Sequence, residues 1–322
     1  MNKPMYRKMI KYIKKYDKIV IGRHIGPDPD CLSAQLALKE VILTAFPEKK
    51  VYAIGAPASK FKFLGKLDKL SENFDTTDAL AIILDTPDRR RIDGVEVEKY
   101  AYSIKIDHHP FIEKTCKLEL FDDTASSTSQ MILEMIFTLK LPLTNHIGES
   151  LYAGIVSDTN RFLFDYTSAY TFELVAKLLK TVDINLNRLY KNLYLRPLNE
   201  LRFLGYIEQN MIVNDNGLAY IKLTDAILQE YKVDPATAGN MINDFNYINE
   251  FIVWCIFSEE IKNEIIRVGV RSRGPKINDV LEKYHGGGHY FAAGARIKTF
   301  KEADEIIETL NKRCEKFLDK EE

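Results

Sequence analysis

The residues best suited to chemistry lie in the segment 103–110, where a short run of alternating polar and apolar residues ends in one aspartate and two histidines. Residues 103–106 are typical of the end of a buried strand, and Pro110 lacks the N–H that would continue a β-ladder. The triplet Asp107-His108-His109 is therefore expected at the carboxyl end of a strand, where open α/β sheets place their ligands. Imidazole is the commonest protein metal ligand, and a neighbouring carboxylate fixes its tautomer. The triplet predicts a metal-centred active site, although a polar turn with two solvated histidines fits these three residues equally well.

Other segments place acids or imidazoles directly after apolar patterns. His24, Asp28 and Asp30 lie on a loop stiffened by two prolines, which lowers the entropy lost when ligands are ordered. Asp85 follows the apolar run 80–84, and Asp158 follows a helical pattern. Taken singly, each of these acids also suits a helix cap or a turn. The metal hypothesis therefore depends on the whole set.

The candidate ligands are carboxylates and imidazoles without a thiolate: His24, Asp28, Asp30, Asp85, His108 and Asp158. Oxygen-rich ligation favours manganese or magnesium over structural zinc. Six side chains are more than one ion needs if it keeps open positions for substrate, so we expect two ions that share a bridging carboxylate. Such a pair lowers the pKa of water and stabilises an attacked phosphoryl group. Four carboxylates balance the charge of two divalent ions, so the centre can accept an anionic phosphate.

The elements that must position these ligands form two regions. The expected strands of a mainly parallel, helix-flanked sheet span residues 18–25, 80–84 and 103–106. Helices are expected at residues 32–46, 126–140 and 146–156, with a short strand at 162–166. Beyond a helical stretch that Pro197 interrupts, the turn Asn216-Gly217 begins a second pattern of hairpins and helices. We predict an α/β metal-binding domain over residues 1–185, a helical linker over 186–209 and a smaller α+β domain over 210–322.

Length and composition fit a two-domain protein. The 322 residues are 46% hydrophobic and carry a net charge of −1, from 45 basic and 46 acidic residues. This balance excludes the strongly basic surface that tracks long nucleic acid, whereas a short phosphate substrate needs only a local basic patch. The four cysteines form no Cys-x-x-Cys pair, and residues 1–17 lack a continuous apolar core. We therefore expect a cytoplasmic protein with reduced thiols and no membrane segment.

The motifs occur in the order characteristic of the DHH phosphoesterase superfamily: His24-x-x-Pro27-Asp28-x-Asp30, Asp85, Asp107-His108-His109, and Asp158 within residues 154–162. The chain resembles the DHH/DHHA1 branch, which contains nanoRNases that also hydrolyse 3′-phosphoadenosine 5′-phosphate. The resemblance implies one manganese ion held by His24 and Asp28, a second held by Asp30, His108 and Asp158, and a bridge through Asp85. It further implies that Asp107 orients a histidine and that His109 contacts the substrate phosphate or assists the leaving group.

A second polar set lies in the carboxyl-terminal region. Arg271 and Ser272 end an apolar strand, and a glycine run flanked by His285 and His289 follows. Consecutive glycines let backbone N–H groups approach an anion as a nest, although a flexible turn is the other interpretation. The run resembles the DHHA1 signature, whose domain binds nucleotide in that family, faces the metal centre across a cleft and moves on a hinge. The resemblance makes the expected substrate-binding residues Arg271, Ser272, Gly286, Gly287, Gly288 and His289.

Two positions depart from the family pattern, because Ser33-Ala34 stands where Gly-Ser is usual and Asn160 where Gly is usual. Neither change removes a ligand. The resemblance implies a homodimeric hydrolase of short single-stranded oligoribonucleotides and 3′-phosphoadenosine 5′-phosphate. A hydrolase of linear or cyclic dinucleotides such as pApA or c-di-AMP shares every motif. The related inorganic pyrophosphatases lack the glycine signature, and a silent nucleotide-binding module would not need the metal ligands.

Overall fold

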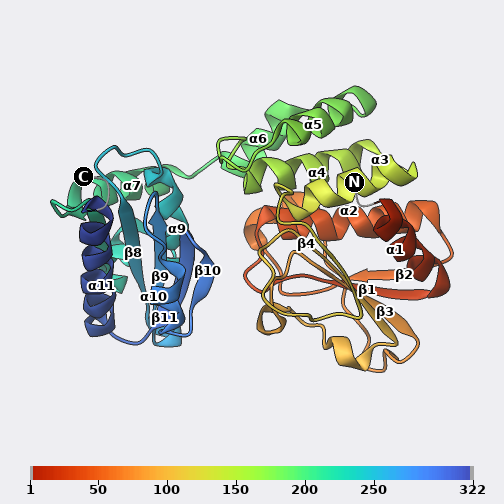
Figure 1. Ribbon diagram of the computed structural model, residues 1–322, viewed down its shortest axis with the longest axis horizontal. Coiled ribbons are helices and arrows are strands. Elements are labelled where there is room, and N and C mark those ends of the chain that lie inside the picture. Colours follow the sequence, from red (N-terminus) through yellow and green to blue (C-terminus); the bar gives the residue numbers. More distant parts are fainter. Residues whose placement is uncertain (1–2, 320–322) are drawn as a thin grey trace. The chain divides into compact units, whose positions relative to one another are not determined.

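The computed structural model describes residues 3–319, and the chain divides into two compact units, Met1–Leu195 and Arg196–Glu322 (Figure 1). Unit 1 contains a parallel sheet with the strand order β2-β1-β3-β4-β5. Its strands are β1 (Lys18–Gly22), β2 (Lys50–Ala53), β3 (Ala79–Leu84), β4 (Tyr102–Asp107) and β5 (Leu118–Phe121). Every residue of the central strand β3 is buried, which explains its uninterrupted apolar sequence. The predicted parallel sheet is confirmed.

The helices of unit 1 lie on one side of this sheet, and the later ones pack on other helices rather than on the strands (Figure 1). They are α1 (Lys3–Lys15), α2 (Pro29–Ala45), α3 (Thr128–Leu139), α4 (Asn145–Asp158), α5 (Ala169–Thr181) and α6 (Leu186–Tyr194). Ile19 and Ile21 of β1 face the helices, whereas Val20 faces a separate cluster on the other side. That second cluster includes Val95 and Val97 from the connection between β3 and β4, which contains the short 3₁₀ turns η2 (Arg89–Arg91) and η3 (Val97–Lys99). Successive side chains of a strand point to opposite faces of the sheet, so residues on both faces of this sheet are buried.

Two local predictions for unit 1 need correction. The helix expected from residue 32 begins earlier, at Pro29, because Asp28 caps it by accepting a hydrogen bond from the Cys31 N–H at 3.0 Å. The strand expected at residues 162–166 is wrong. Asn160, Arg161 and Phe162 all have positive φ, between 47° and 66°, and hydrogen bonds fold their N–H groups back onto the end of α4. The apolar alternation there reflects a packed turn, and Asn160 adopts the left-handed conformation that glycine favours.

Unit 2 is built on a mixed sheet with the order β10-β11-β9-β8-β7-β6. Its strands are β6 (Ile212–Val213), β7 (Leu218–Leu223), β8 (Val253–Glu260), β9 (Ile265–Ser272), β10 (Gly287–His289) and β11 (Ala292–Ile297). Its helices are α7 (Leu198–Asn210), α8 (Asp225–Tyr231), α9 (Pro235–Asn240), α10 (Asn278–Glu282) and α11 (Phe300–Leu318). One face of the sheet packs on α10 and α11, and the other packs on α7, α8 and α9. Trp254 lies in the second of these cores.

The segment expected to form a linker is helical and contains a break at Pro197, which caps α7. Its first helix, α6, packs into the core of unit 1 through Leu189 and Leu193. Its second helix, α7, packs into unit 2 through Phe203 and Ile207. Each helix therefore has a fixed place within its own unit, and the boundary between the units falls between Leu195 and Arg196.

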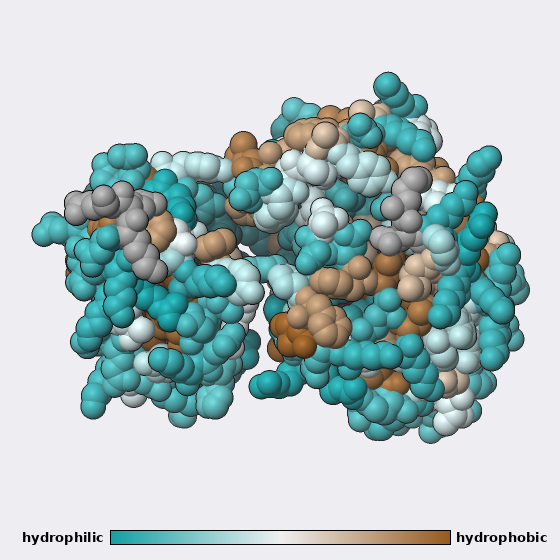
Figure 2. Space-filling view, viewed as in Figure 1, coloured by the Kyte–Doolittle hydropathy of each residue, from teal (hydrophilic) through white to brown (hydrophobic). Residues whose placement is uncertain are grey.

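The outer surface is mostly hydrophilic in the face that Figure 2 shows, with hydrophobic residues in smaller patches. Among residues 3–319, no helix is both long and apolar enough to cross a membrane.

Candidate metal centre and substrate-binding residues

The candidate ligands of unit 1 meet at the carboxyl edge of its sheet. His24, Asp85 and the triplet beginning at Asp107 follow β1, β3 and β4, which are neighbours in the parallel order. The start of α2 supplies Asp28 and Asp30, and the last residue of α4 is Asp158. Because the carboxyl ends of parallel strands lie at one edge, residues far apart in sequence converge there.

Ligand atoms within 4.8 Å of one another form three groups in the described chain. The groups are His24 with Asp28, Cys31 and Asp85; Asp85 with His108 and His109; and Asp30 with His108 and Asp158. Asp85 and His108 each belong to two groups, so the set is continuous. All six predicted ligands are included. Cys31 also places its sulfur in the first group.

Asp85 lies at the centre of this arrangement. Its Oδ2 lies 3.4 Å from His24 Nε2, and its Oδ1 lies 3.4 Å from His108 Nε2. His24 Nε2 is also 3.3 Å from Asp28 Oδ2, and His108 Nε2 is 3.2 Å from Asp158 Oδ2. Asp85 has a φ of 53°, a left-handed conformation that aspartate tolerates better than most residues and that is common at functional sites. The central carboxylate thus presents one oxygen to each imidazole.

The two imidazoles are oriented for metal ligation by backbone carbonyls. His24 Nδ1 lies 2.9 Å from the carbonyl oxygen of Ile25, and His108 Nδ1 lies 3.3 Å from that of Ala125. A carbonyl can only accept a hydrogen bond, so in the neutral rings Nδ1 carries the proton and Nε2 presents its lone pair. Both Nε2 atoms face the carboxylates. The donor set therefore fits a divalent cation.

The start of α3 holds two of the carboxylates, a role that sequence reasoning missed. The N–H groups of Thr128 and Ser129 donate to Asp30 at 2.8 and 3.0 Å, and the Thr128 hydroxyl donates to Asp85 at 2.9 Å. A helix amino terminus stabilises negative charge through its unpaired N–H groups and its dipole. The signal in the sequence is the run of four hydroxyl residues from 126 to 129, all of them buried.

Crowding of buried acids perturbs their pKa values. Burial, and then the charge of Asp85, raises the pKa of Asp30 to about 7. Burial and the charges of Asp30 and Asp85 also raise the pKa of Asp158 well above its usual range. Burial opposes the charged form of His24, but the charge of Asp28 and the hydrogen bonds to Asp28 and Asp85 together outweigh it and raise the pKa of that imidazole. The cluster therefore carries more negative charge than its imidazoles can balance, and this excess favours cation binding.

His109 and Asp107 lie beside the ligand groups. His109 Nδ1 is 2.9 Å from Asp107 Oδ1, which also accepts a hydrogen bond from the His109 backbone N–H at 3.2 Å. His109 Nδ1 is also 3.5 Å from Asp85 Oδ1. Asp107 therefore contacts His109, in line with the expectation that it orients a histidine.

The predicted substrate-binding residues lie together in unit 2. Arg271 and Ser272 end β9, and β11 pairs with β9 on one side and with β10 on the other. The nest expected from the glycine run is not what forms, because residues 287–289 are an extended edge strand. A Cβ at Gly286 or Gly288 would lie 2.4 Å from a carbonyl oxygen of β11, so close strand packing requires glycine there. Arg271 Nε donates to Asn243 Oδ1 at 3.0 Å.

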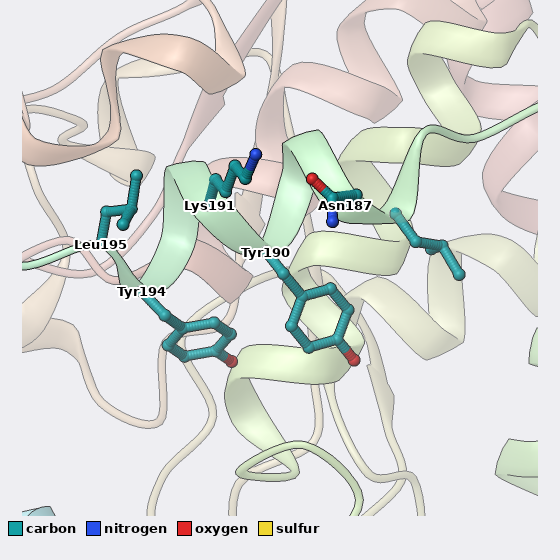
Figure 3. A pocket seen from close by; sticks show the side chains of 6 residues that line it. Asn187, Tyr190, Lys191, Tyr194 and Leu195 are labelled. Atoms are coloured by element: carbon teal, nitrogen blue, oxygen red, sulfur yellow. The ribbon is translucent and has the colours of Figure 1, made fainter.

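A surface cavity of about 530 Å³ lies along α6, apart from the ligand groups. It is lined by Leu186, Asn187, Tyr190, Lys191, Tyr194 and Leu195. Figure 3 shows Tyr190 and Tyr194 projecting to the same side of the helix. The guanidinium of Arg161 lies 5.3 Å from the centre of the Tyr194 ring, which links α6 to the turn that follows Asp158.

Together, the two units define a two-domain α/β protein with a candidate metal centre of the DHH type. Family models match both parts, the DHH family N-terminal domain over residues 18–155 and the DHHA1 domain over residues 215–316. The chain belongs to the DHH/DHHA1 family. The resemblance that the motifs indicated is thereby confirmed.

Two named relatives match this chain over almost its whole length. The bifunctional oligoribonuclease and PAP phosphatase NrnA of Bacillus subtilis is 36% identical over 96% of this chain and 99% of its own length. The probable bifunctional oligoribonuclease and PAP phosphatase NrnA of Streptococcus mutans is 34% identical over 95% of this chain and 97% of its own.

Solved structures share the fold. An exopolyphosphatase-related protein from Bacteroides fragilis superposes with a TM-score of 0.85 at 23% identity and covers 96% of both chains. RecJ from Thermus thermophilus, solved in complex with Mn²⁺, superposes with a TM-score of 0.51 at 12% identity, over 97% of this chain and 54% of that chain.

Replacing Gly154 tests whether Asp30 belongs to a metal site. A Cβ at residue 154 would lie 2.0 Å from Ser129 Oγ and 2.7 Å from Asp30 Oδ1. We expect Gly154→Ala to displace both groups and to weaken Mn²⁺ binding by about 10- to 100-fold, as losses of ligand support typically do. Titration calorimetry with Mn²⁺ measures this change.

The matched control is Gly205→Ala in α7, where nothing lies within 4 Å of the added Cβ. Alanine in place of glycine in a helix should stabilise unit 2 by about 0.5–1 kcal/mol and leave Mn²⁺ affinity unchanged. Equal Mn²⁺ affinity in the two variants would show that Asp30 does not hold the ion.

We expect the increase in Tm that Mn²⁺ binding causes to depend on pH. Because the folded-state pKa of Asp30 is raised to about 7, the folded chain without metal binds more protons than the unfolded chain between pH ~4 and ~7. Its stability therefore falls as the pH rises through this window. Mn²⁺ competes with these protons, so we expect it to raise Tm more at pH 8 than at pH 5.5, as measured by scanning calorimetry. Asp30→Asn should reduce this difference, and an increase in Tm that is the same at both pH values would contradict the assignment.

Proposed function

We propose that this chain is a metal-dependent phosphohydrolase that degrades short oligoribonucleotides to mononucleotides and converts 3′-phosphoadenosine 5′-phosphate to AMP. The main support is the match of both units, along nearly their whole length, to relatives named oligoribonuclease and PAP phosphatase. The continuous group of carboxylates and imidazoles in unit 1 supports the same reaction class, because it provides the donors that such hydrolysis needs.

The proposed cofactor is a pair of Mn²⁺ ions, with Mg²⁺ as the alternative. His24 and Asp28 would hold one ion, Asp30, His108 and Asp158 the other, and Asp85 both. When bound, such ions lower the pKa of water and neutralise charge on the attacked phosphoryl group. The residues of the chain position four of these ligands themselves. The start of α3 binds Asp30 and Asp85, and the carbonyls of Ile25 and Ala125 orient the two imidazoles.

His109 is proposed to contact the substrate phosphate or to assist the leaving group. Asp107 Oδ1 lies 2.9 Å from Nδ1 of its ring, and this contact sets the orientation in which the imidazole would meet the substrate. Asp107 is itself held by Lys105 of β4, whose Nζ lies 3.6 Å from Asp107 Oδ2 and 4.0 Å from Glu119 Oε1. Lys105 is 1% exposed, and a buried ammonium is tolerated only beside such partners. The pair thus fixes the orientation of the histidine.

Unit 2 is proposed to bind the nucleotide through the strand end Arg271-Ser272 and the glycine edge strand with His289. Arg271 suits phosphate because its planar guanidinium offers several donors in a fixed geometry.

Assembly as a homodimer and a cytoplasmic location remain predictions, which light scattering and cell fractionation would test.

The defining assay compares Mn²⁺-dependent hydrolysis of labelled ribo-oligomers of graded length, 3′-phosphoadenosine 5′-phosphate, c-di-AMP and pyrophosphate. We expect release of mononucleotides from the shortest oligomers, together with AMP from 3′-phosphoadenosine 5′-phosphate. Asp85→Ala should lower kcat/KM at least about 100-fold, because loss of a shared ligand costs more than loss of its support. Asp75→Ala, which removes an exposed carboxylate that accepts hydrogen bonds from Thr77, should keep full activity.

Other outcomes of this assay would assign a different function to this chain. Cleavage of dinucleotides alone would favour a cyclic-dinucleotide pathway, and pyrophosphate cleavage at a matching rate would favour a pyrophosphatase. Binding of oligomers with Mn²⁺ present but without turnover would establish a silent binding module.

Lys105→Met tests the support of His109. The variant keeps the apolar stem and leaves Asp107 without its buried cation, so we expect kcat to fall by about tenfold or more with a smaller change in KM. Lys49→Met is the control, because Lys49 is also buried but its partners are the backbone carbonyls of Lys14 and Tyr16 at 3.0 Å and the exposed carboxylate of Asp17 at 3.8 Å, none of which is a candidate ligand or contacts His109. It should lower Tm without lowering kcat. A Lys105→Met enzyme with normal kcat would assign Lys105 a purely structural role.

A further inference from the structure

Two exposed aromatic residues form the turn between β10 and β11. His289 pairs with Ala292, so Tyr290 and Phe291 are the two residues of a tight hairpin turn. Such turns favour glycine, asparagine or aspartate, and aromatic residues gain nothing from burial there. The residues Tyr290 and Phe291 remain 52% and 48% exposed. Departures from local preference of this kind concentrate at functional sites.

The turn is held rigidly beside the proposed phosphate-binding strand end. The Phe291 carbonyl accepts a hydrogen bond from the Ser272 N–H at 2.9 Å, and the Tyr290 carbonyl accepts one from the Ile277 N–H at 2.8 Å. Ala292, the next residue, lies opposite Arg271 in the pairing of β11 with β9. The two rings therefore project from a backbone that is fixed before any ligand binds, which reduces the entropy lost on binding.

Positive charge accompanies the exposed rings. The Lys276 ammonium lies 4.0 Å from the centre of the Tyr290 ring, and Arg271 lies at the adjacent strand end. Aromatic faces beside cations are the combination by which proteins bind single-stranded nucleic acid, since bases stack on the rings and the cations attract phosphates. An apolar protein partner would gain nothing from this charge, so the chemistry favours a nucleic acid.

We propose that Tyr290 and Phe291 form a stacking platform for successive bases of a short single-stranded oligoribonucleotide, with Lys276 attracting its phosphates. This inference rests on the proposed function and adds to it a basis for substrate choice. A strand with several bases can engage both rings, whereas 3′-phosphoadenosine 5′-phosphate has one base. The platform therefore favours oligonucleotides over the single nucleotide without contributing to the chemistry of unit 1.

The experiment measures binding of a fluorescent ribotrinucleotide by anisotropy, with the full chain carrying Asp85→Ala to prevent turnover. On that background we expect Tyr290→Ala and Phe291→Ala each to weaken binding by about tenfold or more. The aromatic replacements Tyr290→Phe and Phe291→Tyr should retain binding, because stacking needs only a ring. In chains with Asp85 intact, KM for 3′-phosphoadenosine 5′-phosphate should change less than about threefold in the alanine variants.

Ile261→Ala is the matched control. Ile261 is 60% exposed and lies in the connection between β8 and β9, at the opposite end of that hairpin from Arg271. Its removal should leave trinucleotide affinity unchanged. Normal affinity in both alanine variants would overturn the platform, as would a loss matched by Ile261→Ala. A changed oligomeric state with normal RNA affinity would instead identify the turn as a protein interface. If the wild-type chain neither binds nor cleaves oligonucleotides, the proposed function itself fails.

Discussion

Burial of several carboxylates in one place is the constraint on which unit 1 depends. Asp30, Asp85 and Asp158 lie close together at the sheet edge, where a low dielectric strengthens their mutual repulsion. Hydrogen bonds to Asp30 and Asp85 offset part of the free-energy cost of this repulsion. Their donors are the N–H groups at the start of α3 and the hydroxyl of Thr128. Gly154 leaves the space in which Asp30 and Ser129 meet. The remaining excess of negative charge is what a cation would neutralise.

The parallel sheet makes such a concentration of charge tolerable. Its two faces are covered, one by helices and the other by the connection between β3 and β4. The candidate ligands are therefore gathered at the strand ends and at the helix termini beside them. Stability comes from the buried faces, so the edge can hold residues that destabilise the fold and still keep their geometry. The positive φ of Asp85 is an example.

The sequence allowed the strands and the six candidate ligands to be predicted, because apolar runs that end in His or Asp carry a local signal. It did not reveal the role of Thr128 and Ser129, whose contacts with Asp30 span almost one hundred positions. The predicted strand at residues 162–166 was wrong because three consecutive left-handed residues cannot be recognised without glycine. The glycine run was assigned to a loop because its pairing with β11 depends on tertiary contacts.

The polar groups of unit 1 are mostly buried, whereas the aromatic turn of unit 2 is exposed. This difference bears on the proposed substrate specificity. Unit 1 buries its polar groups and fixes them with hydrogen bonds, so a change in any ligand disturbs both charge balance and packing. Unit 2 has its own cores on the two faces of its sheet and keeps Tyr290 and Phe291 at a surface turn. Substitutions at that turn leave the apolar cores intact, so they cost little stability. If Tyr290 and Phe291 bind bases as proposed, substrate preference can change through unit 2 while the candidate metal ligands of unit 1 stay the same.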